Sequence, residues 1–164
     1  MDFSIVQDLA APPATVQDAL LDPEFVHVTA TIPKIGGAEL LELTRADTTA
    51  HLRVRYRFTA PLSSAITRVI DPEKLTWVDD GTFALNEFRS DHVLQPDNYA
   101  DRLQASYTST LVSDGAGTRR TLAGSLSVKA PLVGGKIAGV IVDGLREAMA
   151  TQATMLNEWT ARRA

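Results

Sequence analysis

The C-terminal stretch from residue 130 to residue 164 constrains the fold more than any other part of the chain. Mostly apolar side chains recur there at i, i+3, i+4 and i+7, the spacing of an amphipathic helix. The stripe consists of Ile137, Ile141, Leu145, Ala148, Gln152, Met155, Leu156 and Trp159. At about 1.5 Å per residue, such a helix would be about 40 Å long. Its apolar face needs a partner, which the preceding residues must supply.

Most of the chain before this helix alternates as β-strands do. In residues 51–59, large apolar or aromatic side chains share one face, and Arg53, Arg55 and Arg57 share the other. The same reasoning predicts strands at residues 2–10, 39–45, 51–59, 75–78, 86–95, 102–112 and 119–129. Short turns separate them, including one at Asp80-Gly81, and such turns join antiparallel strands.

Two short helices are expected after the first strand. Pro13 suits the first position of a helix that reaches Leu20, and residues 24–29 fit a second short turn. Residues 62–70 fit either a short helix or a strand. The sequence therefore predicts an α+β fold in one domain, residues 1–164. In it, a curved antiparallel sheet of about seven strands wraps on the long C-terminal helix.

Charge and composition exclude several classes of function. The net charge is −4, from 16 Lys and Arg against 20 Asp and Glu, which argues against a nucleic-acid partner. The chain has no cysteine, and His27, His51 and His92 lack ligand spacing, so we expect no metal site and no cofactor. No signal-peptide pattern or membrane-spanning run is visible, so we expect a cytoplasmic monomer or homodimer.

The order of elements resembles the START-like helix-grip superfamily, also called SRPBCC, over the whole chain. The segment Ser125 to Ile137, SLSVKAPLVGGKI, resembles more narrowly a bacterial family of unknown function within that superfamily. The resemblance implies a cavity between the curved sheet and the C-terminal helix. It also implies binding or transport of a hydrophobic or amphipathic, lipid-like small molecule there, and it supplies no catalytic residue.

Polar residues on the inward strand faces are the candidates for the cavity wall. A buried polar group is costly unless it has a partner or a ligand, so these positions call for explanation. With their neighbours on the strands and the long helix, the candidates are Tyr56, Trp77, Asn86, Phe88, Ser90, His92, Tyr107, Ser109, Ile141, Leu145 and Met149. Gly139 and Gly144, together with Met149 and Met155, are expected to set the size of the cavity.

Two hypotheses about function follow. The favoured one is a non-enzymatic binder or carrier of a hydrophobic ligand, because no catalytic motif is present. The alternative is a cyclase-like or hydrolase-like enzyme in which His92 acts as acid or base with Tyr56 or Tyr107. That alternative requires these groups to converge in one cavity. A core histidine satisfied by hydrogen bonds, with core tyrosines beside it, is the non-catalytic interpretation of the same residues.

Overall fold

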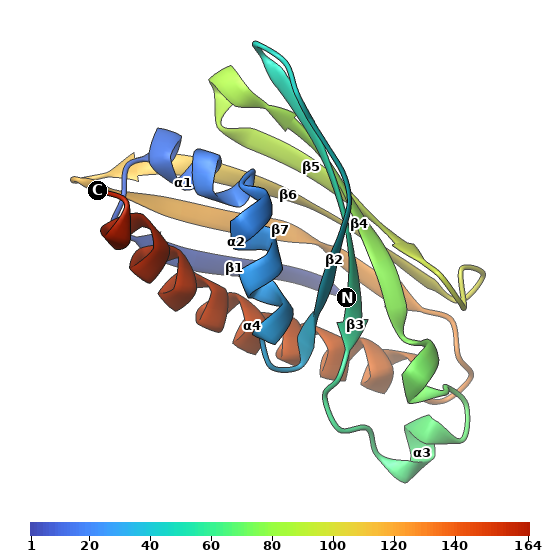
Figure 1. Ribbon diagram of the computed structural model, residues 1–164. Helices are drawn as coiled ribbons and strands as arrows, with labels where there is room; N and C mark the ends of the chain where they lie inside the picture. The colour runs from blue at the N-terminus through green and yellow to red at the C-terminus, as the bar shows by residue number, and fades with distance from the viewer.

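One antiparallel sheet and one long helix dominate the computed structural model, which describes residues 1–164 (Figure 1). The strands are β1 (Asp2–Leu9), β2 (Ile35–Arg45), β3 (Thr49–Phe58), β4 (Thr76–Ala84), β5 (Arg89–Pro96), β6 (Leu103–Asp114) and β7 (Gly117–Val128). The α-helices are α1 (Pro13–Leu20), α2 (Pro23–Val28), α3 (Ser64–Thr67) and α4 (Gly134–Arg162). Three 3-10 turns are η1 (Thr29–Thr31), η2 (Pro72–Lys74) and η3 (Leu85–Glu87).

The seven strands form a single sheet in the order β1-β7-β6-β5-β4-β3-β2, and all neighbours are antiparallel. The sheet curves around α4, which packs mainly on β1 and β7 (Figure 1). Helix α2 lies against β2, and α1 contacts α4. This arrangement confirms the predicted helix-grip fold, including the two short helices after the first strand.

The predicted stripe on α4 forms the centre of the core. Ile137, Ala148 and Leu156 are almost completely buried, and each large apolar side chain contributes about 1.5–3 kcal/mol of transfer free energy. The helix begins at Gly134, where a Cβ atom would collide with the carbonyl oxygen of Val128. A side chain at this position would therefore push the start of the helix off the end of β7.

The strand predicted at residues 75–78 is longer than expected, and the predicted turn at Asp80-Gly81 is wrong. β4 continues through both residues to Ala84. Asp80 lies on the outer face, where its Oδ1 is 2.6 Å from Nε2 of His51 and its Oδ2 is 3.3 Å from Nε of Arg53. These cross-strand partners hold acidic residues in a strand that composition alone assigns to a turn.

The turn between β4 and β5 lies instead at Leu85 to Phe88, which corrects the predicted strand start at residue 86. Phe88 has a left-handed backbone with φ of 50°, and β5 begins only at Arg89. Asn86 consequently lies in η3 and is exposed. Of the two possibilities for residues 62–70, the short helix α3 is the one that forms.

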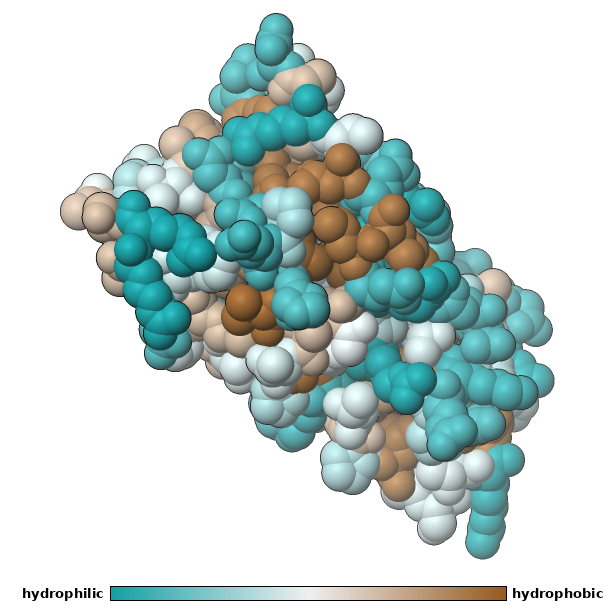
Figure 2. Space-filling view, in the orientation of Figure 1, coloured by the Kyte–Doolittle hydropathy of each residue, from teal (hydrophilic) through white to brown (hydrophobic).

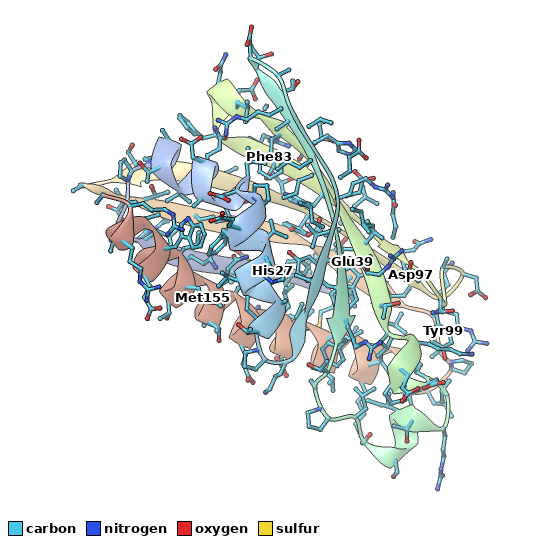
Figure 3. All side chains as sticks on the ribbon, viewed as in Figure 1. His27, Glu39, Phe83, Asp97, Tyr99 and Met155 are labelled. Atoms are coloured by element: carbon cyan, nitrogen blue, oxygen red, sulfur yellow. The ribbon has the colours of Figure 1, made fainter.

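The arginines of β3 lie on the outer face of the sheet, as the alternation predicts. Arg55 donates to Asp97 through Nε at 2.9 Å and Nη2 at 3.0 Å, and its Nη1 lies 3.5 Å from Glu39. Both carboxylates are labelled in Figure 3. Arg53 is paired with Asp80 and Glu42. Much of the positive charge along this strand is therefore neutralised by neighbouring carboxylates.

Candidate functional site

A cavity of about 90 Å³ lies between the sheet and the helices α1, α2 and α4. All seven strands contribute to its wall, from Phe3 on β1 to Ile35 on β2. Phe83, labelled in Figure 3, comes from β4 on the sheet side. Of the 21 lining residues 16 are apolar or aromatic, and the other five are Thr29, Asp79, His92, Arg120 and Gln152. A mostly apolar enclosure with a few polar groups is typical of small-molecule sites.

Two aromatic rings and two glycines form one row across the middle of the sheet. Gly81, His92, Tyr107 and Gly124 are directly paired on β4, β5, β6 and β7. The rings of His92 and Tyr107 stack with centroids 4.3 Å apart and planes 9° apart. A Cβ atom on Gly81 would lie 2.7 Å from Cε1 of His92, and one on Gly124 would lie 2.6 Å from Cβ of Tyr107. Glycine therefore makes room for the stacked pair on both sides.

Asp79 holds this pair from the neighbouring strand. Its Oδ1 lies 2.7 Å from Nδ1 of His92, and its Oδ2 accepts a 2.6 Å hydrogen bond from the Tyr107 hydroxyl. The other ring nitrogen of His92, Nε2, is 2.8 Å from Oγ of Ser90. Burial raises the pKa of Tyr107, and the charge of Asp79 raises it further. The phenol therefore keeps its proton at neutral pH and acts as a donor.

The connected order Ser90–His92–Asp79 matches the hydrogen-bond order of a hydrolase triad, but its location does not suit nucleophilic attack. Asp79 and His92 line the cavity, whereas Ser90 is buried behind the wall. A hydroxyl that cannot touch a bound molecule cannot act as its nucleophile. The group left facing the cavity is the Asp79–His92 pair, which is suited to hydrogen bonding or to proton transfer.

A second buried polar cluster is centred on Arg120 of β7. Its Nε donates to Oγ of Ser109 at 2.9 Å, and its Nη1 donates to Oε1 of Gln7 at 3.1 Å and to Oε1 of Gln152 at 2.8 Å. Gln7 also donates through Nε2 to the carbonyl oxygen of Met149 at 2.6 Å. Burial lowers the pKa of Arg120, yet a guanidinium remains charged in proteins at neutral pH.

Tyr56 contributes a third hydroxyl to the wall. Burial raises the pKa of its phenol, with the charge of Asp79 adding to the effect, while the Thr29 hydroxyl and Arg120 act in the opposite direction. The ring of Tyr56 is tilted against that of Trp77 with centroids 6.3 Å apart. This part of the wall is therefore aromatic, with one protonated phenol.

The structure brings together six of the eleven residues that the sequence proposes for the site. Those lining the cavity are Tyr56, Trp77, His92, Tyr107, Leu145 and Met149. Their role in ligand binding stays a prediction. The other five do not reach the wall of this cavity, for different physical reasons.

Ser90 and Ser109 face inward but lie behind His92 and Arg120, to which their hydroxyls bond. Ile141 packs in the main hydrophobic core. Asn86 is exposed in η3, and Phe88 packs against a separate apolar cluster that includes Leu9, Val16 and Phe25.

The expected role of the α4 glycines in setting the cavity size is also corrected. A Cβ on Gly139 would meet nothing within 4 Å, and Gly139 is not among the residues that line the cavity. A Cβ on Gly144 would lie 2.8 Å from Cε2 of Phe58, so this glycine allows the helix to approach β3 closely. Met149 lines the cavity, whereas Met155 packs against the apolar cluster around Phe25 (Figure 3).

Sequence reasoning missed the three charged or amide side chains that distinguish this cavity. Arg120 has the same parity as Leu122 and Leu126 on its strand, so alternation places it inside. Asp79 lies on the same face of β4 as Trp77, which becomes clear once the strand is extended past residue 80. Gln152 belongs to the helical stripe, where its neighbours are core residues. A search for charged residues on inward faces would have found the first two.

Other kinds of site find little support in the described residues. No group of three or more His, Asp or Glu side chains is arranged to hold a metal ion. None of the helices is both long and apolar enough to cross a bilayer.

Comparisons with known proteins place the chain in a family. Residues 4–160 match the family described as "Protein of unknown function (DUF2505)", and no curated protein matches. Among solved structures, the TTHA0849 protein of Thermus thermophilus is similar with a TM-score of 0.71 and 16% identity, covering 100% of this chain and 99% of that chain.

Two further structures share the fold at low identity. The ZhuI aromatase/cyclase from Streptomyces sp. R1128 has a TM-score of 0.66 and 16% identity, over 99% of this chain and 94% of that one. Ara h 8.0201 has a TM-score of 0.63 and 11% identity, over 99% and 98%. Because the family match spans nearly the whole chain, this protein belongs to the DUF2505 family, and its helix-grip fold is shared by these solved structures.

Proposed function

We propose that the protein binds a small hydrophobic or amphipathic molecule in the cavity between the sheet and α4. The observation that carries the proposal is the cavity itself, which is mostly apolar and has charged groups in its wall. The core around Ile66 and Val142, by contrast, is filled by side chains, and both of these residues are completely buried. Sites of this composition favour ligands with an apolar body and one polar group.

The volume of the cavity limits the size of the ligand. A volume of about 90 Å³ is below the ~300–1,000 Å³ of pockets that take drug-sized molecules. A molecule with a single ring or a short chain fits this space better than a long acyl chain.

One face of the protein, over α2 and β2, also shows apolar surface (Figure 2). Val28 of α2 and Leu40 and Leu41 of β2 are among the exposed large apolar residues.

Ligand-observed NMR with indole and p-cresol tests the proposal, because both probes are small, neutral aromatic molecules. We expect both to receive saturation from the wild-type protein. Leu145→Trp should abolish the signal by filling the cavity. Leu41→Trp is the matched control, because it makes the same change at an exposed position on β2. Equal binding by wild type and Leu145→Trp would show that the probes bind elsewhere.

A second candidate function, acid–base catalysis, is favoured by one observation. Nδ1 of His92 and Oδ1 of Asp79 are 2.7 Å apart, and both residues face the cavity. A carboxylate that orients an imidazole is a common arrangement for a general base. Hydrolysis of p-nitrophenyl acetate would test it. A rate above that of buffer in the wild type, lost in His92→Gln, would support catalysis, and equal rates would exclude it for this ester.

A further inference from the structure

Arg120 is a buried cation without a carboxylate partner. Only 5% of the residue is exposed, and all its hydrogen bonds go to the neutral acceptors Ser109, Gln7 and Gln152. Asp79 is the carboxylate that acts on it, through space and outside ion-pair distance. Buried charges in proteins are normally paired, because an uncompensated ion in a medium of low dielectric is costly. The positive charge of Arg120 is therefore available to a bound molecule.

Two hydrogen-bond donors of this cluster remain unused. Nη2 of Arg120 and Nε2 of Gln152 make no hydrogen bond within the protein. Neither atom is fully enclosed. The one fully enclosed side-chain nitrogen or oxygen without a hydrogen bond is Nε of Arg53, which is 3.3 Å from Asp80 in an ion pair. Both residues line the cavity. The two side chains are also in contact, because Oε1 of Gln152 accepts a 2.8 Å hydrogen bond from Nη1 of Arg120. Their N–H groups without a partner therefore lie close together.

The other charged group of the wall is already satisfied. Each oxygen of Asp79 accepts a hydrogen bond, one from the imidazole of His92 and one from the Tyr107 hydroxyl. Both nitrogens of that imidazole have partners as well. An incoming ligand thus meets donor nitrogens without a partner at Arg120 and Gln152, whereas each oxygen of Asp79 and each ring nitrogen of His92 already has one. This asymmetry favours a ligand that carries an acceptor with negative charge.

We propose that Arg120 and Gln152 bind the carboxylate of a small monocarboxylic acid whose apolar body occupies the rest of the cavity. The inference rests on the proposed function, and it names the ligand class. A carboxylate matches the planar donors of a guanidinium. A phosphate is larger and carries more charge than one arginine offsets, and Asp79 is a second negative charge in the same wall. The apolar body would lie against Trp77, Leu145 and Met149.

Benzoate and benzamide are suitable probes, because they share a ring and differ in the charge of the head group. Isothermal titration calorimetry of the wild type should show benzoate binding at least about tenfold more tightly, a difference of about 1.4 kcal/mol. Arg120→Met should remove that preference, so that the ratio of the two affinities falls to about one. Arg120→Lys should keep part of it, because the charge remains while the planar fork is lost.

Arg119→Met is the matched control. Arg119 is the neighbouring residue on β7, lies on the outer face with Asp8 and Asp114, and its loss changes the net charge equally. We expect Arg119→Met to retain the full preference for benzoate. Equal affinities for the two probes in the wild type would overturn the inference. The inference would also be overturned if Arg119→Met and Arg120→Met reduced the preference for benzoate equally, because that result would indicate a long-range effect of charge.

The outcomes also separate this inference from the proposed function. If indole and p-cresol bind but benzoate has no advantage, the cavity is a neutral site and the role of Arg120 is refuted. If none of the four probes binds, the proposed function itself fails. Should Arg120→Met unfold, the comparison of benzoate with benzamide in the wild type still decides the question.

Discussion

Replacing Gly81 with alanine perturbs the centre of the candidate site by adding one methyl group. Gly81 has no left-handed backbone angle, so alanine introduces no conformational strain of its own. The added Cβ would lie 2.7 Å from Cε1 and 2.8 Å from Nδ1 of His92. Carbon atoms in contact are normally about 3.5–4.0 Å apart, so the imidazole must move by about 1 Å. It is held there between Gly81 and the ring of Tyr107, and Phe83 contacts it edge-on.

The size of the effect follows from these contacts. Overpacking of this kind costs about 1–3 kcal/mol. Displacing the ring also weakens its 2.7 Å contact with Asp79. Alanine restricts the unfolded chain more than glycine does, which offsets about 0.4–1 kcal/mol. We therefore expect a net loss of about 2 kcal/mol in the free energy of unfolding, or roughly 4–8 °C in Tm for a domain of this size.

Urea unfolding followed by tryptophan fluorescence measures this loss, and ¹⁵N–¹H correlation spectra of the imidazole report the contact between His92 and Asp79. Gly139→Ala is the matched control, because its Cβ meets nothing within 4 Å. In that helical position alanine should stabilise the protein by up to about 1 kcal/mol. If Gly81→Ala stays within about 0.5 kcal/mol of the wild type and keeps the same imidazole signals, the close packing of this row is refuted.

Three further substitutions test neighbouring features. Tyr107→Phe leaves Oδ2 of Asp79 without its donor and should cost about 1.5–3 kcal/mol in urea unfolding; no loss would mean that water replaces the hydroxyl. Gly144→Ala should destabilise by about 1–3 kcal/mol, because its Cβ meets the Phe58 ring, whereas stabilisation would show that the ring yields freely. The hydrogen bond to Asp80 raises the pKa of His51 in the folded protein. The pair therefore contributes its full stabilisation below pH 6.5, about the pKa of His51 in the unfolded chain, and this contribution is lost as pH rises through the higher pKa of the folded protein. His51→Gln should therefore lose more stability at pH 5.5 than at pH 8.5, by less than about 1 kcal/mol because solvent screens the pair. In an Asp80→Asn background, the difference between the losses at about pH 5.5 and pH 8.5 should shrink. An unchanged difference would show that Asp80 is not the group that raises the pKa of His51.

Most of the fold could be predicted because its main elements have strong periodicity. The stripe from Ile137 to Trp159 and the alternation of β3 each identify one element and the face that it buries. The end of β4 could not be predicted, because Asp80-Gly81 has the composition of a turn. The ion pairs of Asp80 with His51 and Arg53, which keep it in the strand, involve residues of another strand. Local sequence does not contain that information.

The candidate site was less predictable, since alternation shows which way a side chain points but not how far it lies from a cavity. Ser90 and His92 have the same parity on β5, yet only His92 reaches the wall. The difference depends on the curvature of the sheet and on where α4 crosses it. Arg120 was missed for another reason: an arginine is expected at the surface, and its three buried neutral partners come from β1, β6 and α4.

The two buried polar clusters differ in a way that separates stability from recognition. In the cluster of Asp79, His92 and Tyr107, each polar atom has a partner, so this cluster needs no ligand and its loss should mainly reduce stability. In the cluster of Arg120 and Gln152, the acceptors come from the protein, two donor nitrogens make no hydrogen bond, and both residues line the cavity. A satisfied network favours a structural role for His92 over proton transfer, because its ring would have to break existing bonds to act on a ligand. An open cationic cluster gains free energy when an anion fills it, so substitutions there should change ligand preference more than the stability of the empty protein.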